Sequence, residues 1–587
     1  MKEFFKMMFA SMVGFILTII VVTLIMFIIL AAIVAGATKD EVTVEPNSIL
    51  RITLDKPILD RSPKNPFFID LGPMNKSVGL NDILNDIQRA KEDPNIKGIL
   101  LDVSVIPAGM ATIQEIRSEL LDFKKSGKFI IAYSEVYTQG AYYLATVADQ
   151  IYLEPEGMIV FKGLNAELTF LKGTLDKLDI KMQVVRHGKY KSATEPLFRE
   201  NMSPENHTQI QALIDNSWKT ILQGISESRK IDLPQLIRLA DSLKAQSPES
   251  ALKSKLVDQL KYKDELEKEL KSRLNLDSKK SLTYISLENY SKAADLRKKM
   301  SGQDGRIAVI FCIGNIGGGE GDDQAIGSER ISKAIRKARE NEHVKAIVLR
   351  VNSPGGSALA SDVIWREVDL ATKVKPVVAS FGDVAASGGY YIACPATKIL
   401  ADPTTITGSI GVFGVIPNMK GFFNNKLGIT FDGARTNANS DYIPVTHPMS
   451  PYQTEILQQE IEHIYSGFVS KVAAGRHMTK AAIDSIGQGR VWSGSDAKRI
   501  GLIDDFGGLD QAIKLASDLA HLTNYRLQIL PEQKDPFQAI MDAIMDRNSS
   551  SVIEKELGEN YQYYKYLKEI QEMKGVQARM EFNLQIN

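Results

Sequence analysis

The sequence predicts an α/β protein in which a duplicated domain follows a single membrane-spanning helix. Three observations lead to this prediction: a long apolar N-terminal run, an internal repeat, and alternating strand-like and helix-like segments within each repeat. At 587 residues the chain is too long for one hydrophobic core, so two or more domains are expected. Lys plus Arg and Asp plus Glu both number 71, and this balance gives no reason to expect a nucleic-acid partner.

The N-terminal run has the length of a membrane anchor. No charged residue occurs between Lys6 and Lys39, and residues 15–34 are almost wholly apolar, which is enough for a helix to cross a bilayer. Secretory signals have a shorter apolar region, so we expect a retained anchor within residues 1–45. A small-x-small triplet at residues 35–37 leaves a cleaved signal as the alternative. The lysines before the run place the N-terminus in the cytoplasm and the body outside it.

The remainder of the chain is a tandem repeat. Shifting the sequence by 248 residues lays residues 83–155 over residues 331–403 without a gap, and a shift of 246 continues the match farther on. A polar, Lys-rich stretch separates the two copies, and a charged, Tyr-rich stretch follows the second. The predicted division is an N-terminal repeat at 46–277, a linker at 278–305, a C-terminal repeat at 306–530 and a peripheral helical tail at 531–587.

Within the second repeat, strand-like and helix-like segments alternate. Continuous apolar runs predict strands, and apolar residues at helical spacing predict helices. In chain order these are a strand at 306–313, a helix at 329–339, a strand at 346–351, a helix at 359–371 and a strand at 377–380. This βαβαβ order predicts a buried, mostly parallel sheet in each repeat.

A glycine-rich turn in the second repeat carries the candidate nucleophile. Residues 380–395 read SFGDVAASGGYYIACP, in which a strand-like run enters a tight turn and a helix-like segment follows. Such a turn exposes the Ser387 hydroxyl beside free N–H groups that could stabilise an oxyanion. The alternative is a serine that only caps the helix. The first repeat has Gln139 opposite Ser387, and it has Pro107, which lacks an N–H, opposite Gly355. A serine site of this kind therefore belongs to the second repeat.

A serine nucleophile needs a base, and a lysine motif offers one. None of the seven histidines lies in a pattern typical of a catalytic triad, with His187, beside a glycine, the one exception to consider. Residues 187–196, HGKYKSATEP, have no lysine-bearing counterpart in the second repeat. Burial of Lys191 in this motif would lower the pKa of its amine until it could accept a proton. The alternative is an ordinary surface lysine in a loop.

The sequence also allows predictions for one more serine and the two cysteines. Ser409, in the motif TGSIG, could hydrogen-bond a neutral lysine amine, although the motif by itself is also typical of a turn. Cys312 and Cys394 lie in apolar segments, which favours two buried free thiols over a disulfide. No Cys and His cluster has metal-ligand spacing, so we expect neither a metal nor a cofactor.

Several motifs in order resemble one known family. RVNSPGGS, AASGGYYIA and TGSIGVFG, with GKYKSATEP upstream and an anchor in front, closely resemble the long form of the signal peptide peptidase A (protease IV) family over residues 48–520. The resemblance implies a Clp protease/crotonase-like fold in each repeat. It also implies a homotetramer on the outer face of the bacterial inner membrane, in the periplasm, that degrades cleaved signal peptides without a cofactor.

The same resemblance assigns roles to individual residues. Ser387 matches the nucleophile of a Ser–Lys dyad, Lys191 the general base, and Ser409 the serine that orients the lysine. Gly355 and Gly388 match the backbone oxyanion donors, with Gly356 as the near alternative to Gly355. Two other functions stay open on the sequence: a crotonase-like acyl-transfer enzyme and a catalytically idle membrane scaffold. The exported body argues against the first, and the intact dyad residues argue against the second.

Overall fold

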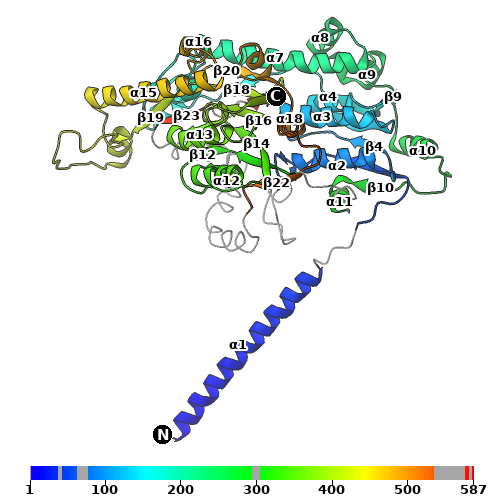
Figure 1. Ribbon diagram of the computed structural model, residues 1–587, viewed down its shortest axis with the longest axis horizontal. Coiled ribbons are helices and arrows are strands. Elements are labelled where there is room, and N and C mark those ends of the chain that lie inside the picture. The colour runs from blue at the N-terminus through cyan, green and yellow to red at the C-terminus, as the bar shows by residue number, and fades with distance from the viewer. Residues whose placement is uncertain are drawn as a thin grey trace.

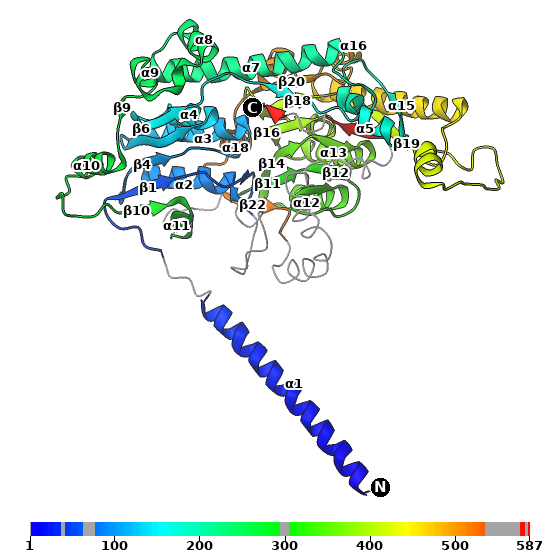
Figure 2. The same cartoon turned by 180° about the vertical axis from the view of Figure 1, so that it is seen from behind.

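The computed structural model describes residues 2–36, 42–62, 77–293, 305–533, 576–580 and 585–586. Helix α1 (Lys2–Gly36) stands away from a body built of two α/β units that lie side by side (Figure 1, Figure 2). Within the described part of the chain, α1 is the one helix that is long and apolar enough to cross a membrane, and its apolar window is not buried against the body. The apolar N-terminal run is therefore a helix, as predicted.

The first unit is built on a parallel sheet with the strand order β10-β1-β4-β5-β6-β9. In that order the strands are Tyr284–Ser286, Ser48–Ile52, Ile96–Asp102, Phe129–Tyr137, Gln150–Ile159 and Gln259–Leu260. Helices α2 (Leu80–Glu92), α3 (Met110–Lys124) and α4 (Gln139–Ala145) cover one face. Helix α10 (Lys263–Arg273) covers the other face. Because both faces are covered, the inner strands are continuous apolar runs.

The second unit repeats this plan. Its parallel strands follow the order β22-β11-β14-β16-β17-β21. They are Arg526–Leu530, Arg306–Ile313, Val344–Ser353, Val377–Ala386, Lys398–Ala401 and Asp505–Phe506. Helices α12 (Ser328–Glu340), α13 (Ala358–Thr372) and α14 (Gly388–Ala393) pack on one face, and α18 (Leu509–Leu519) packs on the other. The shared order confirms the predicted duplication and its α/β class.

The segment predicted as a linker is in part a strand, so that prediction is wrong for its first half. Of residues 278–305, Tyr284–Ser286 forms β10 at the edge of the first sheet. Tyr290, in the following α11 (Leu287–Lys292), is fully buried. A three-residue edge strand with one buried side chain has too little alternation to be recognised among polar neighbours. Residues 294–304 lie outside the described residues.

The tail predicted to be peripheral is central where the structure describes it. Most of residues 531–587, including the predicted helices, lies outside the described residues. Gln577–Arg579, however, forms β23, which lies inside a third sheet, of mixed direction, with the order β13-β12-β15-β23-β19-β8. Ala578 in β23 is fully buried. Backbone pairing over three residues leaves no hydrophobic pattern, which explains why the sequence did not reveal this strand.

Two elements of the first unit extend into the second. Strand β8 (Lys181–Arg186) pairs antiparallel with β19 (Phe413–Asn418) along its whole length. Helix α7 (Pro204–Arg229) lies along the top of both units (Figure 1), and Asn216 Nδ2 donates to Ser493 Oγ at 3.1 Å. The loop that follows β8, with the lysine motif, is therefore held inside the second unit.

A buried ionic cluster joins the two units. Arg350, in the middle of β14, is fully buried. Its guanidinium donates to Asp60 Oδ1 at 2.6 Å and to Glu115 Oε1 at 2.6 Å, and both carboxylates belong to the first unit. Glu115 Oε2 also accepts from the backbone N–H of Leu509 at 2.6 Å. Burial raises the pKa of Glu115, and attraction to Arg350 opposes the rise. The cluster fixes the relative orientation of the two units, because the buried arginine of the second unit and the buried carboxylates of the first unit must stay paired.

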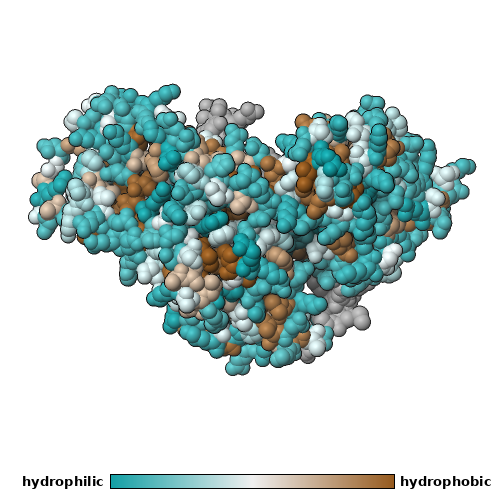
Figure 3. All heavy atoms as spheres, turned by 90° about the horizontal axis from the view of Figure 1, so that it is seen from above, coloured by the Kyte–Doolittle hydropathy of each residue, from teal (hydrophilic) through white to brown (hydrophobic). Residues whose placement is uncertain are grey.

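One irregular segment with several apolar side chains extends from the second unit into solvent. We call residues 428–449 the arm; it connects η5 (Phe422–Leu427) to α15 (Pro451–Gly475) and projects beyond the end of α15 (Figure 1). Ile429, Phe431 and Ile443 in the arm are exposed. Seen from above, the body is otherwise mostly hydrophilic with separate hydrophobic patches (Figure 3).

The ionic cluster leads to a stability prediction. Arg350→Met should lower the free energy of unfolding by about 3–5 kcal/mol, because it leaves two buried carboxylates without their cation. The loss should be smaller at about pH 5 than at about pH 8, because burial raises the pKa of Glu115, so that this carboxyl binds a proton more readily in the folded than in the unfolded chain. Urea unfolding of the full chain in detergent measures both.

A matched control distinguishes the effect of losing a buried arginine from the effect of losing any positive charge. Arg366 makes an exposed ion pair with Asp369 at 2.9 Å, and Arg366→Met should cost about 0–1 kcal/mol. Equal losses for the two variants would contradict the importance of the buried cluster.

Candidate active site

Ser387 lies where β16 ends and α14 begins. The end of β16 leaves β17 and pairs instead with β18 (Ile406–Gly408), so that the strand turns sharply at Ser387. Ser387 has φ 54° and ψ −113°, a conformation that costs a non-glycine residue about 1–3 kcal/mol. Its N–H donates to Gly408 O at 2.8 Å and its carbonyl accepts from Tyr391 N at 2.8 Å. These bonds hold the strained residue in place, and Ser387 is fully buried.

Lys191 reaches Ser387 from the first unit. Its Nζ lies 2.9 Å from Ser387 Oγ, 2.9 Å from Ser409 Oγ and 3.0 Å from Ser409 O. The side chain is among the largest fully buried ones, with 1% of its surface exposed. The structure thus brings together the three side chains that sequence analysis singled out for nucleophile, base and orienting serine.

Two glycines to which sequence analysis gave no role, Gly489 and Gly411 of the TGSIG motif, make room for this lysine. A Cβ added at Gly489 would lie 2.5 Å from Lys191 Cβ, and one added at Gly411 would lie 3.2 Å from Lys191 Cδ. Gly489 also has φ +79°, in the left-handed region. The sequence offered one signal, the spaced glycines in GQGR at 487–490, but nothing linked them to a residue some 300 positions away.

The backbone around Ser409 is equally constrained. Ser409 has φ 50°, and its N–H donates to Arg490 O at 2.7 Å. Tyr190, next to Lys191, donates from its N–H to Gln488 O at 3.0 Å. The segment 488–490 therefore holds both the serine and the lysine loop, which fixes the distance between them.

The three glycines predicted as oxyanion donors are not equivalent. A Cβ added at Gly355 would lie 2.7 Å from the backbone nitrogen of Gly388, so these two residues adjoin. Gly388 is the first residue of α14, where an N–H has no acceptor within its own helix. The Gly355 N–H donates to Ser353 Oγ at 3.1 Å. Gly356 faces β12 (Asn315–Gly317) instead, because a Cβ there would lie 2.1 Å from Ile316 O.

The candidate histidine and the first unit's equivalent turn show no such arrangement. His187 Nδ1 lies 2.6 Å from Glu462 Oε2, and its ring stacks on Tyr465 at 3.6 Å. In the first unit, the Gln139 side chain donates to Gly163 O at 3.2 Å and accepts from Gly163 N at 3.0 Å. An amide bonded to the backbone on both sides is structural, so this turn of the first unit has no counterpart of Ser387.

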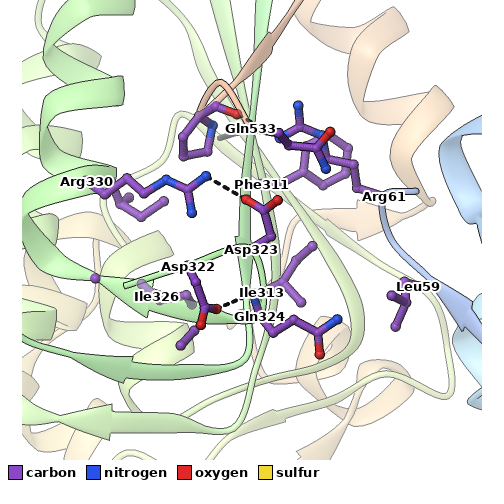
Figure 4. Close-up of a pocket in the computed structure, with 14 residues that line it drawn as sticks. Leu59, Arg61, Phe311, Ile313, Asp322, Asp323, Gln324, Ile326, Arg330 and Gln533 are labelled. Atoms are coloured by element: carbon purple, nitrogen blue, oxygen red, sulfur yellow. Dashed lines mark hydrogen bonds and ion pairs between the residues drawn. The ribbon is translucent and has the colours of Figure 1, made fainter. Parts of the chain in front are cut away.

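A small cavity lies elsewhere, at the junction of the units (Figure 4). Its volume is about 40 Å³, enough for a few water molecules. Arg61 lies over the Phe311 ring at 5.7 Å, and Arg330 pairs with Asp323 at 2.6 Å. Ser387 and Lys191 do not line it.

Comparison with known proteins defines the class. The family model described as Peptidase family S49 matches residues 122–277 and 369–523, one stretch in each unit. The protein is thus a serine peptidase, which decides against the acyl-transfer enzyme that the sequence left open. More narrowly, the chain belongs to Peptidase family S49, and its resemblance to signal peptide peptidase A is confirmed.

Three similar proteins cover most of the chain. Protease 4 of Salmonella typhi is 39% identical over 482 residues, 81% of this chain and 76% of that protein. Protease 4 of Haemophilus influenzae is 36% identical over 76% of this chain and 74% of that protein. The chloroplastic serine protease SPPA of Arabidopsis thaliana is 33% identical over 92% of this chain and 78% of that protein. A solved ClpP1 N165D mutant from Listeria monocytogenes matches at a TM-score of 0.24 and 16% identity, covering 35% of this chain and 94% of that chain, which is too low to add to the assignment.

Proposed function

We propose that the protein is a membrane-anchored serine endopeptidase with a Ser–Lys dyad, in which Ser387 is the nucleophile and Lys191 the general base. The observation that supports this most is the 2.9 Å separation of Lys191 Nζ and Ser387 Oγ in a fully buried site. A base must lie within hydrogen-bond reach of the proton it takes, and this pair does.

The surroundings of the lysine suit a neutral amine. A neutral amine has two N–H groups and one lone pair. Ser409 supplies two acceptor oxygens, O at 3.0 Å and Oγ at 2.9 Å, for the two N–H groups. The lone pair is then left to accept the proton of Ser387 Oγ. Burial disfavours the charged ammonium, which favours this protonation state.

The reaction follows from this geometry. Ser387 Oγ attacks a peptide carbonyl while Lys191 takes its proton, and Lys191 then delivers the proton to the leaving amine. The N–H groups of Gly388 and Gly355 stabilise the oxyanion, with Gly355 exchanging its bond to Ser353 for the substrate. Gly356 shapes the adjoining strand and does not act as a donor. Water then releases the acyl group from Ser387. No cofactor takes part in this scheme.

The substrates we propose are cleaved signal peptides and other apolar, unfolded peptides. Next to Ser387 lies an apolar cluster, and four of its buried members come from both units: Ile210, Leu213, Ala386 and Val491. Strand β15 (Gly355–Ser357) lies beside Gly388, the residue after Ser387, and the edge that pairs with β23 can hold an extended peptide by main-chain hydrogen bonds, as in β-strand addition. A folded protein offers no free strand to pair in this way.

We further propose that α1 anchors the protein in the inner membrane of a bacterium, with its body in the periplasm. Lys2 and Lys6 lie at the N-terminal end of this apolar helix and favour the cytoplasm.

The dyad makes a direct prediction. Ser387→Ala should abolish peptide hydrolysis, Lys191→Ala should reduce it to a similar degree, and the double variant should be no worse, because residues that act as a unit are not additive. We expect losses of at least about 10³-fold in kcat/KM. Hydrolysis of an apolar fluorogenic peptide by the full chain in detergent measures this. As a control, the His187→Ala variant should retain most of its activity. An inactive His187→Ala variant would point instead to a Ser–His site.

The anchor makes a second prediction. In spheroplasts, protease added outside should digest the body while the chain stays in the membrane fraction. A body that resists digestion until the cells are lysed, or a mature chain that begins after Ala37, would refute the orientation or the anchor.

The arm leads us to propose self-association, with a homotetramer as the expected state. Asp179 after α5 (Lys172–Lys177) and Gly428 after η5 have matching left-handed φ values of 56° and 67°. The following strand of the first unit, β8, pairs with the second unit, whereas the corresponding arm of the second unit is exposed. An exposed segment with apolar side chains can pack on the first unit of a neighbouring copy in the same way, and head-to-tail contacts close into a ring where the rotation between copies allows it.

This proposal predicts a change in mass. The double variant Ile429→Asp/Phe431→Asp should shift the full chain in detergent to smaller assemblies by light scattering, because it charges the apolar arm. A matched control, Asn437→Asp/Asn439→Asp, adds the same charge at exposed polar positions and should leave the mass unchanged. Equal masses for both variants would refute the role of the arm.

A further inference from the structure

A short segment near the C-terminal end of the chain lies where a peptide would have to lie to reach Ser387. We call residues 576–580 the tail segment; it contains β23. Strand β23 runs antiparallel to β15, with Arg579 opposite Gly355 and Ala578 opposite Gly356. On its other edge, Gln577 lies opposite Phe413 of β19 (Figure 1). The tail segment thus fills a slot between two strands of the second unit.

Backbone hydrogen bonds beyond the strand fix both ends of the tail segment. Ala358 N donates to Val576 O at 3.3 Å, and Met580 N donates to Pro354 O at 2.7 Å. Main-chain bonds of this kind do not depend on the sequence of the occupant. The slot can therefore hold another extended peptide in the same way.

The tail segment also places a carbonyl beside the two glycines proposed as oxyanion donors. A Cβ added at Gly355 would lie 2.1 Å from Ala578 O, and one added at Gly388 would lie 3.0 Å from the same oxygen. The Ala578 carbonyl oxygen therefore lies against both glycines, beside the turn that carries Ser387. A substrate cannot occupy that place while Ala578 does.

All four residues from 577 to 580 are buried, including the polar Gln577 at 7% exposed and Arg579 at 9% exposed. Ala578 is fully buried, and Met580 is 7% exposed within the apolar cluster that includes Ala386, the residue before Ser387. Small and apolar side chains two residues apart match the period of an extended strand. With the tail segment in place, Ser387 and Lys191 are closed off from solvent.

From these contacts we infer that the tail segment is an intramolecular occupant of the peptide-binding slot and competes with substrate for it. The inference rests on the proposed function for the identity of the slot. The segment must leave before a substrate can bind, so its affinity for the slot sets the fraction of enzyme that is open. This makes the tail segment a built-in competitive inhibitor.

Peptide binding in the Ser387→Ala background tests the inference independently of catalysis. Met580→Asp places a carboxylate in an apolar cluster and should expel the tail segment, whereas Met580→Leu should keep it bound. The probe is a fluorescein-labelled peptide with the sequence of residues 574–582, KGVQARMEF, added to the full chain in detergent. Its anisotropy should show at least tenfold tighter binding to Met580→Asp than to Met580→Leu. Equal affinities, or no binding to either variant, would overturn the inference.

A second measurement needs no change in the tail segment. In the full-length Ser387→Ala chain, a saturating concentration of the same peptide should speed hydrogen exchange at the backbone amides of residues 577–580, because the peptide displaces them. Unchanged exchange would overturn the inference even if Met580→Asp fails to fold. Neither readout requires hydrolysis, so an inactive wild-type enzyme would refute the proposed function and leave this test standing.

Discussion

The antiparallel pairing of β8 with β19 is the contact on which the rest of the site depends. It places Arg186, only five residues before Lys191, opposite Phe413, only four residues after Ser409. The lysine loop is therefore carried to the serine by main-chain hydrogen bonds between the two units. Such bonds tolerate changes of side chain but not of register, since a slip of one residue would turn every side chain to the other face.

The buried ionic cluster is a second contact between the two units, separate from the pairing of β8 with β19. Arg350 lies on β14 between two carboxylates of the first unit, and its own strand leads directly to Gly355. Charges buried in this way add little stability by themselves, but they strongly disfavour any arrangement that separates them. The cluster therefore fixes the orientation of the units, while β8 and α7 supply the contacts that hold them together.

Conformational strain is concentrated where the chemistry is proposed. Ser387 and Ser409 both have positive φ values, and both are held by backbone hydrogen bonds to neighbouring segments, Ser387 to Gly408 O and Ser409 to Arg490 O. Residues in such conformations persist only where the surroundings determine them fully. The second unit meets this condition by surrounding the turn with β18, the segment 488–490 and the lysine loop. In the first unit the Gln139 side chain hydrogen-bonds to the backbone instead, which is consistent with a purely structural role for that turn.

The sequence by itself determined the α/β duplication, the apolar N-terminal helix and the small set of residues from which the site is built. These depend on local patterns: apolar periodicity, glycine turns and residues that differ between the copies at Ser387 and Lys191. Only the tertiary structure decided that Lys191 Nζ lies 2.9 Å from Ser387 Oγ, that Gly355 adjoins Gly388 while Gly356 does not, and that β10 and β23 are strands. These features depend on main-chain pairing between segments far apart in the chain, and such pairing leaves no periodic signal in either segment.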